Sequence, residues 1–201
     1  MLELAILGLL KERPMHGYEL KKRLSYMLGH FWTVSYGSLY PALKRLEKSK
    51  AIERAYSVKE KTRNRNVYRI TEAGEKKFIT LLADTSKPST LVDSEKFDIR
   101  MAFFQYLEPE TRLSLLEERR AVLEEQVAKF KAYRSSNRDQ DRYQVGLLRH
   151  KVEQTKSDIR WLERLIAHEK ETLRARDEKT ASEPELEREG DKGRMKAASS
   201  A

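Results

Sequence analysis

The sequence predicts a mostly α-helical fold with one small β wing, divided into a basic N-terminal domain and a helical second half. Only eight glycines and five prolines occur in 201 residues, which disfavours a turn-rich β fold. Apolar residues recur at spacings of three and four along most of the chain, as amphipathic helices require. Residues 1–90 carry 18 lysines and arginines against nine acids, which equals the whole net charge of +9.

The first two helices are predicted at residues 2–12 and 17–28. The opening apolar run ends before Pro14, which disfavours helix in the residue preceding it. This run contains Glu3 and lacks a basic leader, so we expect a buried helix and not a signal peptide. In the second segment Leu20, Leu24 and Leu28 recur at helical spacing, and Gly29 then interrupts the pattern.

The third helix is predicted to end near residue 50, and the sequence leaves two starting points open. Ser35 and Ser38 are both favourable N-caps. If Ser38 is the cap, Pro41 lies in the first turn, where a missing N–H costs little. If Ser35 is the cap, Pro41 forfeits one helical bond, and Gly37 one turn earlier eases the steric clash.

Two short strands, 52–58 and 66–70, are predicted from their β-branched and aromatic residues, with a polar hairpin tip at 59–66. Thr71 is placed to cap a fourth helix at 72–83. Three helices, a basic hairpin and another helix form a winged helix-turn-helix, which we assign to residues 1–86.

The second half is predicted to be an antiparallel helical arm at residues 87–176. A linker at 84–95 leads to a short helix at 97–107, which ends before Pro109. Two long helices follow at 110–135 and 140–175, and their apolar residues occupy coiled-coil positions with imperfections at Arg120 and Thr155. These positions, which we predict to be the dimerisation residues, are Leu113, Leu116, Leu123, Val127, Leu148, Val152, Ile159, Leu162 and Ile166. Residues 177–201 have few large apolar side chains and are predicted to be a disordered tail.

The candidate site is the polar face of the third helix. Leu39, Leu43 and Leu46 form one narrow stripe that must face the core. The opposite face suits a DNA major groove, because small residues allow close approach while cations and hydroxyls can contact bases or phosphates. It carries Gly37, Pro41, Lys44, Arg45 and Lys48, flanked by Ser38 and Tyr40. The alternative is an ordinary solvated helix face.

The hairpin tip strengthens the prediction of a double-stranded DNA partner. It contains Lys59, Lys61, Arg63 and Arg65 against the single acid Glu60. A basic wing of this kind can enter a narrow minor groove, where the negative potential is concentrated. The alternative is a soluble loop whose charges protect a strand edge from aggregation.

Three motifs in order resemble the PadR family of bacterial transcription regulators: HGYEL at 16–20, SYGSLYPAL at 35–43 and YRITEAG at 68–74. The helical second half resembles the longer members, with the architecture of the virulence activator AphA. The resemblance implies a homodimer paired through the C-terminal helices, and a repressor that binds a pseudo-palindromic operator, often that of its own gene.

The same resemblance assigns roles to two of the motifs and to the hairpin. It places the recognition helix at Tyr36–Lys48 and the wing at 58–68, which adds Tyr36 to the DNA-binding residues. It also gives His16, Tyr18 and Leu20 of the first motif a structural role, in which they set how the second helix supports the third.

Other function classes receive less support from the sequence. No phosphate loop, nucleophile elbow or dinucleotide fingerprint occurs, and the four histidines lack metal-ligand spacing, so we expect no enzyme, metal or cofactor. Absence of cysteine fits a reducing cytoplasm, and no apolar run approaches the ~20 residues that span a membrane.

Two further hypotheses remain. Some members of the family bind flat hydrophobic ligands through a tryptophan, which makes Trp161 a candidate effector contact, although a packing role is the alternative. The chain could also be a protein-interaction adaptor that uses its long helices to bind another protein, because fold does not fix function.

Overall fold

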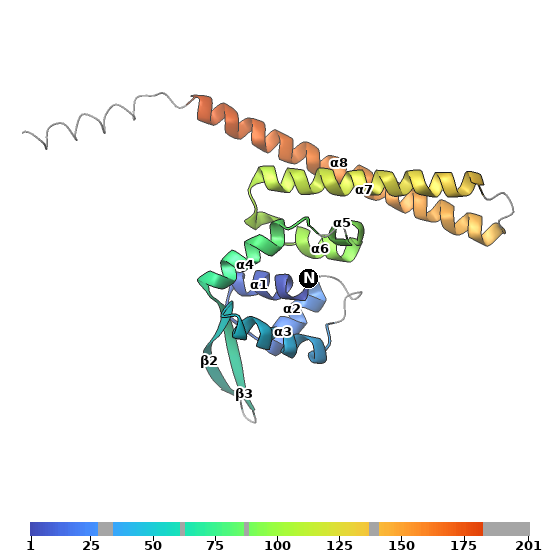
Figure 1. The fold of residues 1–201 in the computed structure, drawn as a ribbon. Helices are drawn as coiled ribbons and strands as arrows, with labels where there is room; N and C mark the ends of the chain where they lie inside the picture. The colour runs from blue at the N-terminus through green and yellow to red at the C-terminus, as the bar shows by residue number, and fades with distance from the viewer. Residues whose placement is uncertain (28–33, 61–62, 87–88, 137–140, 183–201) are drawn as a thin grey trace, which may run out of the picture.

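A computed structural model describes residues 1–27, 34–60, 63–86, 89–136 and 141–182, and it has two parts (Figure 1). A winged domain lies below an arm made of two long helices. The elements in chain order are α1 (Leu2–Glu12), β1 (Met15–His16), α2 (Gly17–Met27), α3 (Tyr36–Lys48), β2 (Ile52–Glu60), β3 (Arg63–Ile70), α4 (Glu72–Ala83), α5 (Ser89–Val92), α6 (Ser94–Met101), η1 (Phe104–Tyr106), α7 (Pro109–Ser136) and α8 (Arg142–Ser182).

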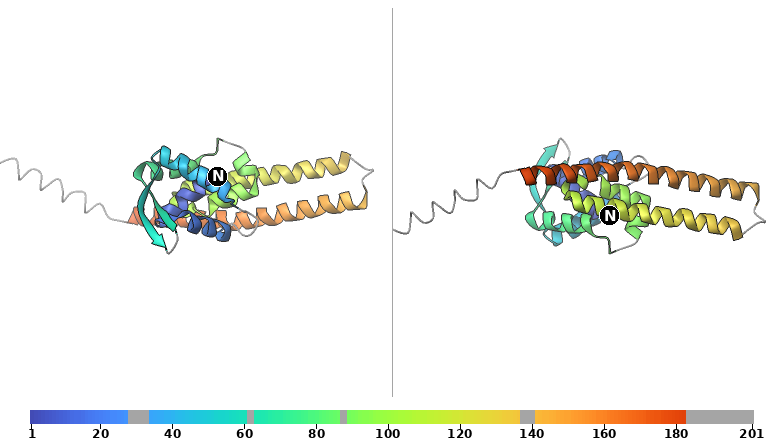
Figure 2. Two further views of the ribbon diagram at one scale, coloured as in Figure 1. Left: turned by 90° about the horizontal axis from the view of Figure 1, so that it is seen from below. Right: turned by 90° about the horizontal axis from the view of Figure 1, so that it is seen from above.

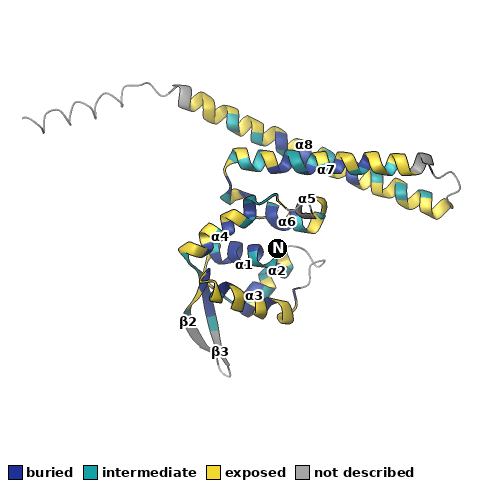
Figure 3. Ribbon diagram, in the orientation of Figure 1, coloured by how far each residue is buried: buried dark blue, intermediate teal, exposed yellow. Residues whose placement is uncertain are grey.

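The core of the winged domain is built around α1. Every residue of α1 from Leu4 to Leu10 is buried, because α2, α3, α4 and β3 all pack against this helix. Figure 3 shows α1 mostly in the colour of buried residues. The predicted first helix is therefore confirmed as a central core element.

The structure decides between the two predicted starts of α3. Ser35 is the N-cap, and its Oγ accepts a hydrogen bond from the amide of Ser38 at 3.1 Å. Pro41 consequently lies inside the helix, where it cannot donate a backbone hydrogen bond to Gly37. The helix tolerates this position because its opposite face is fixed by buried leucines.

The wing is a three-stranded antiparallel sheet in the order β1-β3-β2. The strand β1 was not predicted, because two residues are too few to give a periodic pattern; Met15 pairs with Tyr68. Strands β2 and β3 are also longer than predicted and pair from Ile52 with Ile70 to Glu60 with Arg63. The predicted tip at 59–66 is therefore wrong as a loop, since most of it continues the hairpin.

The segment between winged domain and arm is more structured than the predicted linker. Residues 89–92 form α5, and α6 begins at Ser94, where the Asp93 side chain accepts a hydrogen bond from the Lys96 amide. The predicted helix at 97–107 is divided into α6 and the short 3-10 helix η1. One cluster of buried residues runs from α1 through this segment into the arm, so the core is continuous across residue 86.

The arm consists of α7 and α8, which lie side by side and antiparallel in two views (Figure 2). Among the predicted coiled-coil positions, Leu116, Leu123, Val127, Leu162 and Ile166 are buried within the single chain. The other four, Leu113, Leu148, Val152 and Ile159, are half-buried. The seam of predicted coiled-coil residues therefore joins the two helices of one chain. Helix α8 continues to Ser182, so it extends beyond residue 177, the predicted start of the tail.

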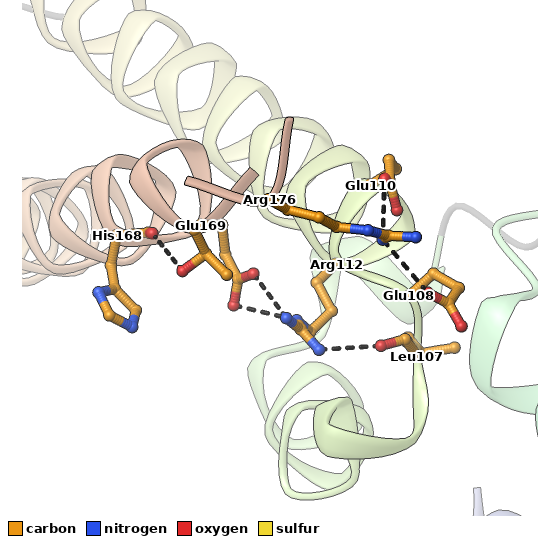
Figure 4. A network of polar contacts seen from close by, with 8 residues as sticks. Leu107, Glu108, Glu110, Arg112, His168, Glu169 and Arg176 are labelled. Carbon is orange, nitrogen blue, oxygen red and sulfur yellow. Dashed lines mark hydrogen bonds and ion pairs between the residues drawn. The ribbon is translucent and has the colours of Figure 1, made fainter. Parts of the chain in front are cut away.

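A polar clasp fixes the base of the arm (Figure 4). Arg112 donates two parallel hydrogen bonds to the Glu169 carboxylate, at 3.0 and 2.9 Å, and a third to the Leu107 carbonyl at 2.9 Å. Both charged side chains are mostly buried. The clasp connects α7, α8 and the residue that follows η1, in the segment that leads to the winged domain.

Arg119 is an unexpected member of the buried seam. The pattern placed the arginine imperfection at Arg120, but Arg119 is the buried one. Its Nη1 donates hydrogen bonds to the carbonyls of Leu91 and Val92, and its guanidinium lies 5.3 Å from the centre of the Phe97 ring. Burial lowers the pKa of Arg119, while nearby acids, Asp98 first, oppose that shift. This arginine holds α5 and α6 against α7.

The Arg119→Ala variant should lose about 2–3 kcal/mol of unfolding free energy, because its charged hydrogen bonds to the carbonyls of Leu91 and Val92 disappear and the buried Leu91 carbonyl loses this donor. The neighbouring Arg120→Ala variant is a matched control, since Arg120 has a distant 3.7 Å ion pair with Glu124 and should change stability by about 0.5 kcal/mol or less. Urea denaturation followed by circular dichroism measures both. Equal losses would contradict the assigned role.

Candidate nucleic-acid interface

The face predicted on α3 is solvent-exposed over its whole length. Leu39, Ala42, Leu43 and Leu46 are buried, which turns the opposite side outward. All eight residues named from the sequence are exposed: Tyr36, Gly37, Ser38, Tyr40, Pro41, Lys44, Arg45 and Lys48. The helical wheel therefore gave the correct orientation of α3, and a helix of this kind can lie in a major groove.

The three cations on this face differ in their surroundings. Among the residues that the structure describes, Lys44 and Lys48 have no hydrogen-bond or ion-pair partner. Arg45 instead donates from Nε to Oε1 of Glu3 on α1, at 3.0 Å. Within the described part of the chain the two lysines are thus available to phosphates, whereas Arg45 is held by Glu3.

An aromatic cluster at the start of α3 connects it to α2. The rings of Tyr36 and Tyr40 stack with centroids 6.1 Å apart, and the Lys21 ammonium lies 4.0 Å from the Tyr36 ring centre. The Tyr40 ring also lies against Gly17, where a Cβ atom would come within 3.3 Å of it. Gly17 therefore permits the close packing of α2 on α3 that sets the angle of the exposed face.

The exposed side of α2 was missed as part of the site. Tyr18, Lys22 and Tyr26 follow one another at spacings of four and are all exposed. Their hydroxyl and ammonium groups can contact phosphates, as the helix before a recognition helix does when it crosses the DNA backbone. The spacing of four was the available signal, but the HGYEL motif suggested a role in packing alone.

The wing extends away from the helices as a hairpin (Figure 1). Its predicted cations Lys59, Arg63 and Arg65 lie on paired strands, with Lys59 opposite Asn64. Lys61 lies outside the described residues. At the base of the wing, Arg54 pairs with Glu47 at 2.8 Å and Arg69 with Glu53 at 2.6 Å. These two arginines at the base of the hairpin are therefore neutralised by acidic neighbours.

The remaining candidates lie on the arm. Trp161 is on α8 and exposes 37% of its surface, so it is not a core residue. None of the helices in the described ranges is both long and apolar enough to cross a membrane. In the same ranges no group of three acidic or histidine side chains is arranged to hold a metal ion.

Comparisons with protein families match two separate parts of the chain. The model of the transcriptional regulator PadR-like family matches residues 6–79, and the model of the virulence activator alpha C-terminal family matches residues 95–168. Two different family models thus cover the winged domain and most of the arm.

Individual relatives are also transcriptional regulators. The negative transcriptional regulator PadR of Bacillus subtilis is 26% identical over 179 residues, covering 83% of this chain and 96% of the relative. The probable transcriptional regulator Rv1176c of Mycobacterium tuberculosis is 29% identical, covering 47% of this chain and 53% of its own.

Solved structures include two forms of the B. subtilis protein. In its complex with operator DNA, the B. subtilis chain is 22% identical in sequence to this chain. The match covers 84% of this chain and 98% of the B. subtilis chain, with a TM-score of 0.41. Its complex with p-coumaric acid is 23% identical, with the same coverage and a TM-score of 0.38.

Proposed function

Because the chain belongs to the PadR-like family of transcriptional regulators, we propose that it is a sequence-specific DNA-binding repressor that acts as a homodimer on a pseudo-palindromic operator. The observation that carries this proposal is the fully exposed face of α3, on which Lys44 and Lys48 have no ion-pair partner among the described residues. The name of the B. subtilis relative, a negative regulator, supports the sign of regulation. The protein would act in the bacterial cytoplasm, where its operator lies, and would catalyse no reaction.

The elements divide the contacts with DNA among them. α3 would enter the major groove, where the small residues Gly37 and Pro41 permit a close approach to the base edges. The exposed side of α2 would contact the flanking phosphates and fix the register. The hairpin of β2 and β3 would reach the adjacent minor groove with the cations near its tip.

Fluorescence anisotropy with two duplexes tests the proposal. One probe is the DNA upstream of the protein's own gene, and the other is a scrambled duplex of the same composition, each at two salt concentrations. Tighter binding to the upstream DNA that persists at high salt supports a specific, self-regulating repressor. Equal and salt-sensitive binding places the operator elsewhere. Absence of binding to both would contradict DNA recognition and favour the adaptor hypothesis.

The double variant Lys44→Ala with Lys48→Ala should weaken binding to all duplexes to a similar extent, and should lower the salt dependence by about one unit per lost phosphate contact. Titrations over a salt series measure both quantities. The control is Lys156→Ala, an exposed lysine on the arm, which should leave affinity and slope unchanged. A double variant with wild-type salt dependence would remove α3 from the interface.

A second copy of the chain is proposed to pack on the outer side of the arm. The predicted coiled-coil residues are largely used within one chain, whereas Tyr143 and Leu147 on α8 expose 86% and 60% of their surfaces. Residues 128–152 contain seven lysines and arginines against two acids, and residues 91–127 contain nine acids against five cations. If the basic residues 128–152 of one arm lie against the acidic residues 91–127 of the other, the two arms attract one another.

The Leu147→Glu variant should shift the protein from dimer to monomer, because it places a carboxylate in the apolar part of the proposed contact. Light scattering after size exclusion gives the molar mass. Gly146→Glu at the neighbouring exposed position is a control for charge alone. A monomeric wild-type protein would contradict the homodimer.

An effector is proposed to act near Trp161. The exposed part of its indole can stack on a flat apolar ligand, and its position on α8 lies on the same helix as Glu169 of the clasp. Tryptophan fluorescence, with p-coumaric acid as the first probe, measures binding, and operator anisotropy measures the response. If no tested molecule alters operator affinity, the regulator is constitutive.

A further inference from the structure

Glu3 connects three helices of the winged domain through one carboxylate. It is the second residue of α1, and its side chain is only 26% exposed. Oε1 accepts the hydrogen bond from Arg45 Nε on α3, and Oε2 accepts one from Lys77 Nζ on α4 at 2.9 Å. Both oxygens are therefore held, so the carboxylate cannot rotate freely.

This carboxylate is charged at neutral pH. Burial by itself would raise the pKa of Glu3, but hydrogen bonds and the positive charges of Lys77 and Arg45 outweigh burial and lower it. Its place in the first turn of α1 also favours the negative charge, because a helix N-terminus is partially positive. An ionised acceptor forms shorter and stronger hydrogen bonds with a guanidinium than a neutral one does.

The bond to Glu3 determines which part of Arg45 remains available. Nε is occupied, so the two terminal Nη groups are left at the end of a side chain that is 61% exposed. A guanidinium held in this way keeps its planar donor fork and loses less side-chain entropy when it binds a ligand. Lys44 and Lys48 have no such support among the described residues and can direct their charge to any phosphate.

The position of Arg45 on α3 suits a contact in the groove. Ser38, Pro41 and Arg45 follow at spacings of three and four, so they form one edge of the exposed face over two helical turns. An arginine fork matches the O6 and N7 acceptors of guanine, and such a bidentate contact is the commonest specific one in the major groove.

We propose that Glu3 is a positioning residue that directs the Arg45 fork at a guanine, which makes Arg45 the cation of α3 that determines sequence specificity. The inference rests on the proposed function, since it assigns a role within the same DNA interface. It separates Arg45 from Lys44 and Lys48, which supply affinity without selecting a base.

In vitro selection from a randomised duplex pool tests this assignment and requires no known operator. The experiment compares the wild type with four variants: Glu3→Gln, Arg45→Lys, Glu3→Gln combined with Arg45→Lys, and Lys77→Met. Wild type should select a guanine at one or more positions. Glu3→Gln and Arg45→Lys should both reduce that preference by about ten- to a hundredfold, and the double variant should be no worse than Arg45→Lys.

Controls distinguish positioning from a general structural role. Lys77→Met removes the other partner of Glu3 but keeps the Arg45 bond, so it should retain the guanine preference. Binding to an unselected duplex and the thermal midpoint should change little in Glu3→Gln, whereas a structural defect would weaken all sequences together. A Glu3→Gln variant that selects the wild-type guanine would overturn the inference. A wild type that selects no sequence would instead overturn the proposed function, and the inference with it.

Discussion

The Gly74→Ala variant is expected to lose about 3 kcal/mol or more of unfolding free energy, an upper-range cost for adding one methyl group. A Cβ atom at this position would lie 1.9 Å from the carbonyl oxygen of Ala51 and 2.8 Å from Cγ1 of Ile70. The first obstacle is backbone, so no side-chain rotation relieves it. That carbonyl also accepts hydrogen bonds from the amide and the hydroxyl of Thr71, both at 3.1 Å.

Displacing Ala51 would disturb the start of the wing as well as α4. Ala51 precedes β2, and Thr71 caps α4 by accepting a hydrogen bond from the Gly74 amide at 3.1 Å. The close approach of α4 to this turn therefore depends on the absence of a side chain at Gly74. This gives the YRITEAG motif a physical reason for its last residue.

Thermal and urea unfolding followed by circular dichroism measure the effect. The matched control is Gly146→Ala on α8, where an added Cβ meets nothing within 4 Å. That change should stabilise the chain by about 0.5–1 kcal/mol, because alanine is the better helix former. If Gly74→Ala also unfolds at or above the wild-type midpoint, the packing of α4 against Ala51 is not as described.

The Phe78→Ala variant is expected to cost about 3–5 kcal/mol, the usual range for a large aromatic removed from a core. Phe78 on α4 is fully buried and contacts two rings of the following segment edge to face. The centroid distances are 5.7 Å to Phe103 and 5.5 Å to Tyr106. Phe103 in turn lies against Gly8 of α1, so these rings join the winged domain to the segment that leads into the arm.

Urea denaturation of Phe78→Ala gives the loss in stability, and Ile79→Ala is the neighbouring control. Ile79 is 38% exposed on the same helix and should cost about 1 kcal/mol or less. Operator affinity in the same variant tests whether the junction also sets the geometry of DNA binding. A loss below about 1 kcal/mol in Phe78→Ala would mean that winged domain and arm are not held together by this cluster.

Regular patterns in the sequence were sufficient for α1 to α4, for the two long helices α7 and α8, and for the orientation of the candidate interface. The leucine stripe of α3 determines which side of that helix is buried, and the eight residues on the other side follow by geometry. The three motifs were sufficient for the resemblance to the PadR family, whose model matches residues 6–79, while the segregation of positive charge to residues 1–90 indicated only a polyanionic partner. These features depend on neighbours close in sequence, which is why a single chain reveals them.

Contacts between residues that are distant in the sequence could not be predicted from these patterns. The strand β1, the division of the predicted 97–107 helix and the choice of Ser35 as the cap all depend on what lies opposite each segment. The same is true of Arg119, which is buried where the pattern favoured Arg120, because the carbonyls of α5 are on that side. Only the fold brings these partners within hydrogen-bonding distance.

Lys44 and Arg45 show most clearly what the sequence determines and what only the tertiary structure decides. The sequence places these adjacent cations on one helix face and does not distinguish between them. Charge and periodicity alone determined that a basic helix face points outward. The tertiary structure decided that Lys44 is free among the described residues and that Arg45 is held by Glu3, 42 residues earlier in the chain. The physical reason is that helical period fixes the direction of a side chain, whereas its partners depend on how α1 packs against α3.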